Sequence, residues 1–165
     1  IRPWEGLSGG LAAFAEHALD QGLHHWTTQE RDGLLEVADL AEELLSGVDR
    51  VCLVHSDLNP KNLLVDPASL AITGLVDWEY AHAGHPFTDL GNVLRFDRQP
   101  AYVEAVLATY GRARAVAPSE ALALARAADL FALIDLAGRA GTNPVADRAE
   151  HHLRSVARSG DPHAT

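Results

Sequence analysis

A run of polar residues between short apolar segments carries most of the side-chain chemistry of this chain. Asp57 lies five residues before Asn62. Asp77 lies fifteen residues after Asn62, directly after the apolar segment 71–76. Phosphoryl transfer from a nucleotide needs one carboxylate to orient the acceptor hydroxyl, and an amide oxygen and a second carboxylate to hold magnesium. These three side chains supply that set if a loop and a hairpin bring them to one end of a small sheet. Each of them alone would more often cap a turn.

The segments around these residues are expected to be short strands. Apolar runs predict strands over 51–54, 62–65 and 71–76, the first of them buried, and loops over 55–61 and 77–88. Cys52 lies in the first run and is expected to be a small buried side chain. The polar insert over 51–90 therefore holds the chemistry.

Helical patterns flank the insert on both sides. Apolar residues at helical spacing predict a first helix from Ser8, its N-cap, to about Gly22, and a second over 28–45 that ends before Gly47. Helices are also expected near 89–95, 101–110, 119–138 and 145–158. The fold class expected from this order is α+β, mostly α-helical, with a small β insert that carries the catalytic loop.

Composition narrows the functional classes. The chain has 165 residues, 47% of them apolar, and a formal net charge of −10. One domain is expected, and its charge would repel nucleic acids and anionic membranes while favouring a cationic substrate. A single cysteine excludes an internal disulfide or a cysteine-based zinc cluster. Neither a signal peptide nor a membrane-spanning stretch is evident, so a cytoplasmic location is expected.

The histidines offer a competing interpretation. His82 and His85 are spaced tolerably for metal ligands, with His24 and His25 elsewhere in the chain, which would suit a transition-metal site or a metal-dependent hydrolase. However, no cysteine partners and no His-Glu-x-x-His motif accompany them. Surface or loop-bracing histidines are the default expectation.

Three ordered motifs resemble the aminoglycoside phosphotransferase and choline kinase group, which has a protein kinase-like fold. They are His55-Ser56-Asp57 with Asn62, Leu75-Val76-Asp77-Trp78-Glu79, and Asp89-Leu90-Gly91. The resemblance is sharpest over 51–96. Ser56 replaces the usual glycine of the first motif, which indicates a local difference in the loop.

The resemblance implies a role for each matching residue. Asp57 would be the catalytic base, and Asn62 and Asp77 would hold Mg²⁺ for ATP or another nucleoside triphosphate. His55 would brace the catalytic loop, and Asp89 would cap or tether it. Lys61 would either contact a nucleotide phosphate or remain a solvent-exposed lysine. In this group later helices read the acceptor, which makes Asp129, Asp135 and Asp147 candidates for binding an aminoglycoside or another cationic amine.

The resemblance also implies that residues 1–165 form only the C-terminal lobe of such a fold. The N-terminal nucleotide lobe, with its phosphate-covering loop and lysine, is expected to be absent, because the pattern before Val51 is helical and lacks lysine. The chain alone is therefore expected to be inactive, and the face left without its lobe is expected to favour a homo-oligomer. The alternative function is a non-catalytic binding or interaction module derived from a kinase-like lobe.

Overall fold

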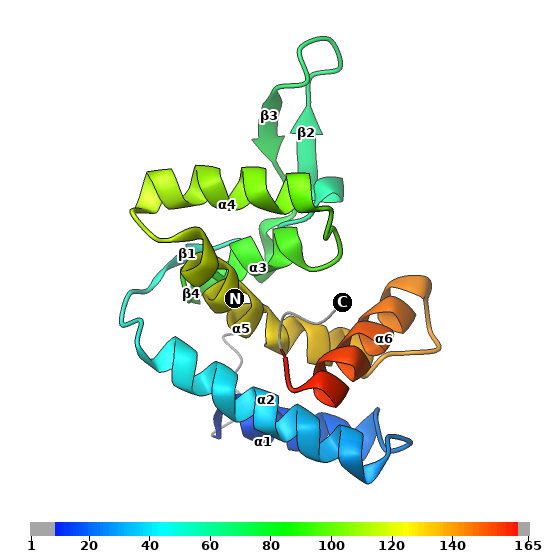
Figure 1. Cartoon of the computed structure of the whole chain (residues 1–165). Coiled ribbons are helices and arrows are strands. Elements are labelled where there is room, and N and C mark those ends of the chain that lie inside the picture. Colours follow the sequence, from blue (N-terminus) through cyan, green and yellow to red (C-terminus); the bar gives the residue numbers. More distant parts are fainter. Residues whose placement is uncertain (1–8, 162–165) are drawn as a thin grey trace.

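A computed structural model describes residues 9–161, which form mainly helices together with two small sheets (Figure 1). The elements are α1 (Gly10–Gln21), α2 (Thr28–Ser46), β1 (Cys52–Val54), η1 (Pro60–Asn62), β2 (Leu63–Val65), β3 (Ile72–Leu75), η2 (Trp78–Tyr80), β4 (His82–Gly84), α3 (Thr88–Leu94), α4 (Pro100–Arg114), α5 (Pro118–Ala137) and α6 (Pro144–Ser159). The predicted class, α+β and mostly helical, agrees with this order. Among the helices of these residues, none is long and apolar enough to cross a bilayer.

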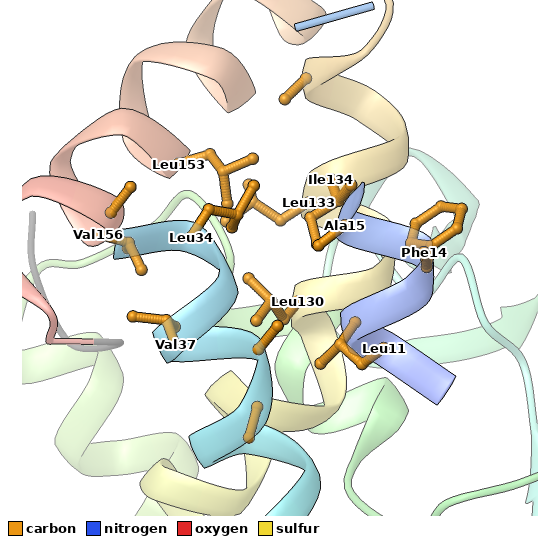
Figure 2. Packing of buried hydrophobic residues seen from close by; sticks show 14 of the residues in the cluster. Leu11, Phe14, Ala15, Leu34, Val37, Leu130, Leu133, Ile134, Leu153 and Val156 are labelled. Carbon is orange, nitrogen blue, oxygen red and sulfur yellow. The ribbon is translucent and has the colours of Figure 1, made fainter. Parts of the chain in front are cut away.

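Helix α5 lies at the centre of the molecule and contributes to two apolar clusters (Figure 1). The larger cluster joins α5 to α1, α2 and α6, with Leu34, Ile134 and Leu153 fully buried (Figure 2). The smaller one joins the other side of α5 to α3 and α4, around Leu94 and Leu107. Because α3 begins within the polar insert over 51–90, this second cluster ties the insert to the helical body.

Local signals explain where the helices begin. The Thr27 hydroxyl accepts the Glu30 N–H while the Glu30 carboxylate accepts the Thr27 N–H, which is a complete capping box for α2. Proline occupies the first turn of α4, α5 and α6, where its missing N–H costs nothing. The predicted N-cap Ser8 lies outside the described residues. Helix α4 continues to Arg114, four residues beyond its predicted end, and closes on Ala115 in the left-handed conformation.

The strands form two separate two-stranded sheets, in which β1 pairs with β4 and β2 pairs with β3, both antiparallel. Strand β4 lies inside the segment 77–88, so the prediction of a continuous loop there was wrong. The prediction of a buried first strand was also wrong, because Val51 and Leu53 are 65% and 70% exposed, and Cys52 is only half-buried. Of the three residues of β1, only Val54 is fully buried.

Candidate active site

Asp57 and Asn62 are held together at the junction between the catalytic loop and β2. The Asn62 amide nitrogen donates to the Asp57 carbonyl oxygen at 2.9 Å and to its carboxylate Oδ2 at 3.0 Å. Asn59 donates to the other carboxylate oxygen, Oδ1, at 2.9 Å. The Asp57 side chain is nevertheless 28% exposed. It is thus a fixed carboxylate that a ligand can still reach.

Asp89 tethers the first half of this loop from the start of α3. Its two carboxylate oxygens accept the backbone N–H groups of His55 and Ser56, at 2.9 and 2.8 Å. Charge-assisted bonds of this kind are among the stronger hydrogen bonds in proteins. They fix the chain direction just before Asp57.

His55 connects the loop to the end of β3. It is 2% exposed, and its Nε2 donates to the Val76 carbonyl at 2.9 Å while its Nδ1 accepts the Asp57 N–H at 3.3 Å. Its ring centre lies 4.8 Å from that of Trp78. Through this one side chain, the backbone on either side of Asp77 is coupled to the position of Asp57.

Asp77 lies two residues beyond the end of β3 and is the N-cap residue of the turn η2. The backbone N–H of Val76 donates to the Asn62 carbonyl at 3.0 Å, so Asp77 follows a residue bonded directly to Asn62. Asp77 has a left-handed backbone, with φ 69° and ψ 54°, and its side chain is exposed. Aspartate adopts this conformation more readily than most non-glycine residues, and residues held in it cluster at functional sites as well as in turns.

Ser56 and Lys61 modify the loop around Asp57. Ser56 has a φ of 68°, which explains why glycine is usual at this position in the group that the motif resembles. The Lys61 ammonium is 3.4 Å from Asp57 Oδ2, and its side chain is 70% exposed. An exposed pair of this kind contributes little stability, so Lys61 can turn to another anion at small cost.

A buried polar network behind the loop was missed by the sequence analysis. Asn92, on α3, accepts the Leu58 N–H at 3.2 Å and donates to Asp129 Oδ1 at 2.9 Å. Arg95 binds both oxygens of Asp129, at 2.7 and 2.9 Å. The spacing of Asn92 three residues after Asp89 was the available signal, because it puts both on one face of α3. Asp129, a candidate acceptor-binding residue, is instead 4% exposed and bound within the core.

Two of the candidate acidic residues and the histidines have other partners. Asp135 is paired with Arg139, and the Asp147 carboxylate accepts the Gly141 N–H at 2.6 Å. His82 Nδ1 donates to the Tyr80 carbonyl, and His85 Nδ1 accepts the Phe87 N–H. Burial lowers the pKa of His85. Within residues 9–161, no group of three or more histidine, cysteine or acidic side chains is placed to hold a metal ion.

The oxygen atoms at the site nevertheless suit a cation that brings further ligands with it. With the Asn62 nitrogen committed to Asp57, its amide oxygen is the atom left for a cation. Magnesium bound through one or two carboxylates, waters and substrate phosphates needs no closed protein cage. Asn62 and Asp77 fit that arrangement, in which a nucleotide completes the coordination.

Comparison with known proteins adds independent information. A model of the family described as phosphotransferase enzyme family matches residues 4–124. Acyl-CoA dehydrogenase family member 11 of Mus musculus is 38% identical over 45 residues, which are 27% of this chain and 6% of that protein. The protein of that name in Gallus gallus is 32% identical over 57 residues, 34% of this chain and 7% of its own length. No solved structure matches the chain significantly.

Proposed function

This chain belongs to the phosphotransferase enzyme family, and from that premise we propose that it transfers a phosphoryl group from ATP to a hydroxyl of a small molecule. The observation that carries the proposal is the contact of Asp57 with Asn62, whose carbonyl in turn accepts the N–H of Val76, the residue before Asp77. This bond supports the proposal that Asp57, Asn62 and Asp77 supply the three functions required for phosphoryl transfer.

Each residue of the site has a proposed role. Asp57 orients the acceptor hydroxyl and takes its proton as the oxygen attacks the terminal phosphorus of ATP, whose bond to the bridging oxygen breaks to release ADP. Asn62 and Asp77 hold magnesium, which neutralises the charge of the transferred group when it is bound with ATP. His55 and Asp89 are positioning residues, since they contact the loop backbone and Asp57 rather than a substrate. Lys61 is proposed to exchange its contact with Asp57 for a nucleotide phosphate.

A complete enzyme of this kind needs a second, strand-rich lobe to cover the nucleotide. The large apolar side chains exposed around the site support this, because they offer a surface to cover. They include Leu53, Leu64, Ile72 and Tyr80, which are 51–70% exposed. Because phosphoryl transfer depends on positioning, we propose that residues 1–165 alone do not turn over. The use of ATP also favours a cytoplasmic protein.

Magnesium titration of the chain, followed by NMR, tests the site without requiring turnover. Backbone amide signals of residues 55–62 and 76–79 should shift with added MgCl₂, more strongly when a non-hydrolysable ATP analogue is present. Asp77→Asn should weaken the response about tenfold or more, because it removes a ligand charge. Asp66→Asn is the control, since it removes the same charge from an exposed aspartate in the hairpin turn between β2 and β3, where the Asp66 carboxylate accepts the Ser69 N–H.

Amide signals that do not shift with magnesium or nucleotide would contradict the proposal. That result would favour the alternative, a binding or interaction module that keeps the loop but not its chemistry. A response of equal size in Asp77→Asn and the unmodified chain would remove Asp77 from the magnesium site.

A further inference from the structure

Three arginines, Arg98, Arg126 and Arg148, form a cluster of positive charge in a chain whose net charge is −10. They surround His152, whose ring nitrogen contacts the Arg98 guanidinium. Burial and then the charges of these arginines lower the pKa of His152 to about 4, so it stays neutral and adds no charge of its own. The cluster is therefore a local exception to the acidic character of the chain.

Among residues 9–161, the carboxylates of Asp129 and Asp161 both act on Arg98. Asp129 lies near enough to act on Arg98 and Arg126, but both of its oxygens are bound to Arg95. Burial and then repulsion from Arg126 lower the pKa of Arg98 to about 10, despite the opposing effects of Asp129 and Asp161. The buried Nε of Arg126 has no hydrogen-bond partner among the described residues. The charges of Arg98, Arg126 and Arg148 would stabilise an anionic group placed beside them.

A cavity of about 720 Å³ joins the cluster to the catalytic loop. Asn59 and Pro60 line it on the loop side, and Phe96, Arg98, Tyr102 and Arg148 line it on the helical side. Asn59 donates directly to Asp57 Oδ1, so the cavity begins one side chain from the proposed base. Its volume lies within the range of small-molecule sites.

Of the arginines that line this cavity, Arg148 is the more exposed. Arg148 is exposed; its guanidinium carbon lies 4.9 Å from the centre of the Phe96 ring, and it donates to the Phe96 carbonyl. A stacked guanidinium keeps its outer N–H groups in one plane, which suits an oxyanion. Asp97 also lines the cavity, but its carboxylate accepts the Gln99 N–H at 3.2 Å.

We propose that this cavity binds the acceptor, and that the acceptor is a polyhydroxyl compound with an anionic carboxylate or phosphate group held by Arg98 and Arg148. This inference rests on the proposed phosphotransferase function and specifies its substrate class. It replaces the expectation of a cationic amine, which followed from the net charge alone. Net charge acts at long range and is screened beyond about 8 Å at physiological salt, whereas the two arginines touch the ligand.

A second cavity, of about 610 Å³, is the weaker candidate for this ligand. It shares Arg98 and adds Arg126, but its remaining walls come from α4 and α5 and are mainly apolar. No residue of the catalytic loop lines it. A hydroxyl bound there would not face Asp57.

Four open-chain six-carbon polyols test the proposal, because they differ mainly in charge: gluconate, sorbitol 6-phosphate, sorbitol and glucamine. Each is titrated into the ¹⁵N-labelled chain at constant ionic strength, and the arginine Nε–H and loop amide signals are followed. Gluconate and sorbitol 6-phosphate should bind at least tenfold more tightly than sorbitol, and glucamine should bind most weakly. The two anions separate a carboxylate site from a phosphate site.

Variants of Arg148 separate recognition from folding. Arg148→Gln should weaken gluconate about tenfold and leave sorbitol unchanged, while Arg148→Glu should make glucamine the preferred ligand of the four. Arg112→Gln is the control, because Arg112 lies at the other end of α4, ten residues and about 15 Å beyond Tyr102. It should change none of the affinities.

Several outcomes would overturn the inference. They are equal affinity for gluconate and sorbitol, tightest binding of glucamine by the unmodified chain, or displacement of gluconate from the arginines by a magnesium–ATP analogue. The last result would assign the arginines to the nucleotide. If magnesium shifts the Asn62 and Asp77 signals but gluconate does not bind, the acceptor class is wrong and the phosphotransferase proposal stands. If gluconate binds but magnesium has no effect, the catalytic proposal fails and the anion site remains.

Discussion

Ser56 carries backbone strain at the start of the catalytic loop. Its φ of 68° is favourable for glycine and costs other residues about 1–2 kcal/mol. The surroundings impose this conformation, because Asp89 binds the N–H groups of both Ser56 and the preceding residue. The two hydrogen bonds to Asp89 therefore offset the energetic cost of this conformation, and the strain itself remains in the folded chain.

Ser56→Gly should stabilise the chain by up to about 1 kcal/mol, since the relief of strain exceeds the added entropy of the unfolded chain. Urea unfolding followed by circular dichroism measures this change. Ser119→Gly serves as the comparison, because Ser119 lies in the first turn of α5, where glycine should destabilise the helix. A loss of stability in Ser56→Gly would show that the serine is not strained.

The sequence was informative about the site only where residues act within a short segment. Asp57 and Asn62 are five residues apart in one loop, and their types alone indicate the chemistry. Asn92 and Asp129 are joined by a hydrogen bond across 37 residues, from α3 to α5. No local pattern distinguishes such a pair from ordinary helix-surface residues, so the support behind the loop required the tertiary structure.

At the scale of elements, the close contact of α2 with α6 depends on Gly33. A Cβ added at Gly33 would lie 2.0 Å from the Ala157 carbonyl oxygen of α6. Backbone atoms cannot move aside as a flexible side chain can. The two helices would have to separate, and the buried residues between them would lose contacts.

Gly33→Ala should therefore lower the free energy of unfolding by about 1–2 kcal/mol, even though alanine favours helix. Gly47→Ala provides the control at the end of the same helix, where the nearest atom to an added Cβ is 3.7 Å away. Chemical denaturation of both variants measures the difference. Equal stability of the two would mean that α6 does not pack on Gly33.

Glu30 links the same two helices by charge. Burial opposes its ionisation, but hydrogen bonds from Thr27 and Arg158 and the charge of Arg154 outweigh burial and lower the pKa to about 2. An acid with a lowered pKa stabilises the fold above its unfolded pKa of 4.5, and this contribution disappears as the pH falls toward 2.

Thermal unfolding as a function of pH tests this linkage. Between pH 4.5 and 2 the chain should lose about 1–3 kcal/mol through Glu30, and Glu30→Gln should flatten that part of the profile while lowering stability at pH 7. His152 titrates in a different window: its pKa is lowered from 6.5 to about 4, so it destabilises the fold as the pH falls from 6.5 to 4. An unchanged profile below pH 4.5 in Glu30→Gln would contradict the assignment.

The helices could be predicted from the sequence because their apolar residues repeat at helical spacing and proline or Thr27 marks their starts. Strand β4, His82-Ala83-Gly84, could not, since it has no β-branched residue and pairs with β1 across about 30 residues. The exposure of Leu53 also could not be predicted from the residues around it in the sequence. An apolar run looks the same whether another surface covers it or not.

At the scale of the whole molecule, exposed apolar side chains gather on one hairpin. Strands β2 and β3 project away from the helices (Figure 1). Leu64, Val65, Leu70 and Ile72, on the strands and their connecting turn, are 47–76% exposed. The negative net charge opposes association, but it is screened at physiological salt, whereas the apolar attraction is not.

The chain should consequently self-associate at high concentration, and more strongly when salt is added. Ile72→Lys should reduce this association several-fold by placing a charge on the exposed hairpin, without changing the circular dichroism spectrum. Val145→Lys is the matched control, because Val145 is 51% exposed but lies at the start of α6. Light scattering over a concentration series measures the effect. Since Val145→Lys brings the same charge, an equal reduction by both variants would assign the association to net charge rather than to the hairpin. A strict monomer at every concentration would show that the hairpin has no role in assembly.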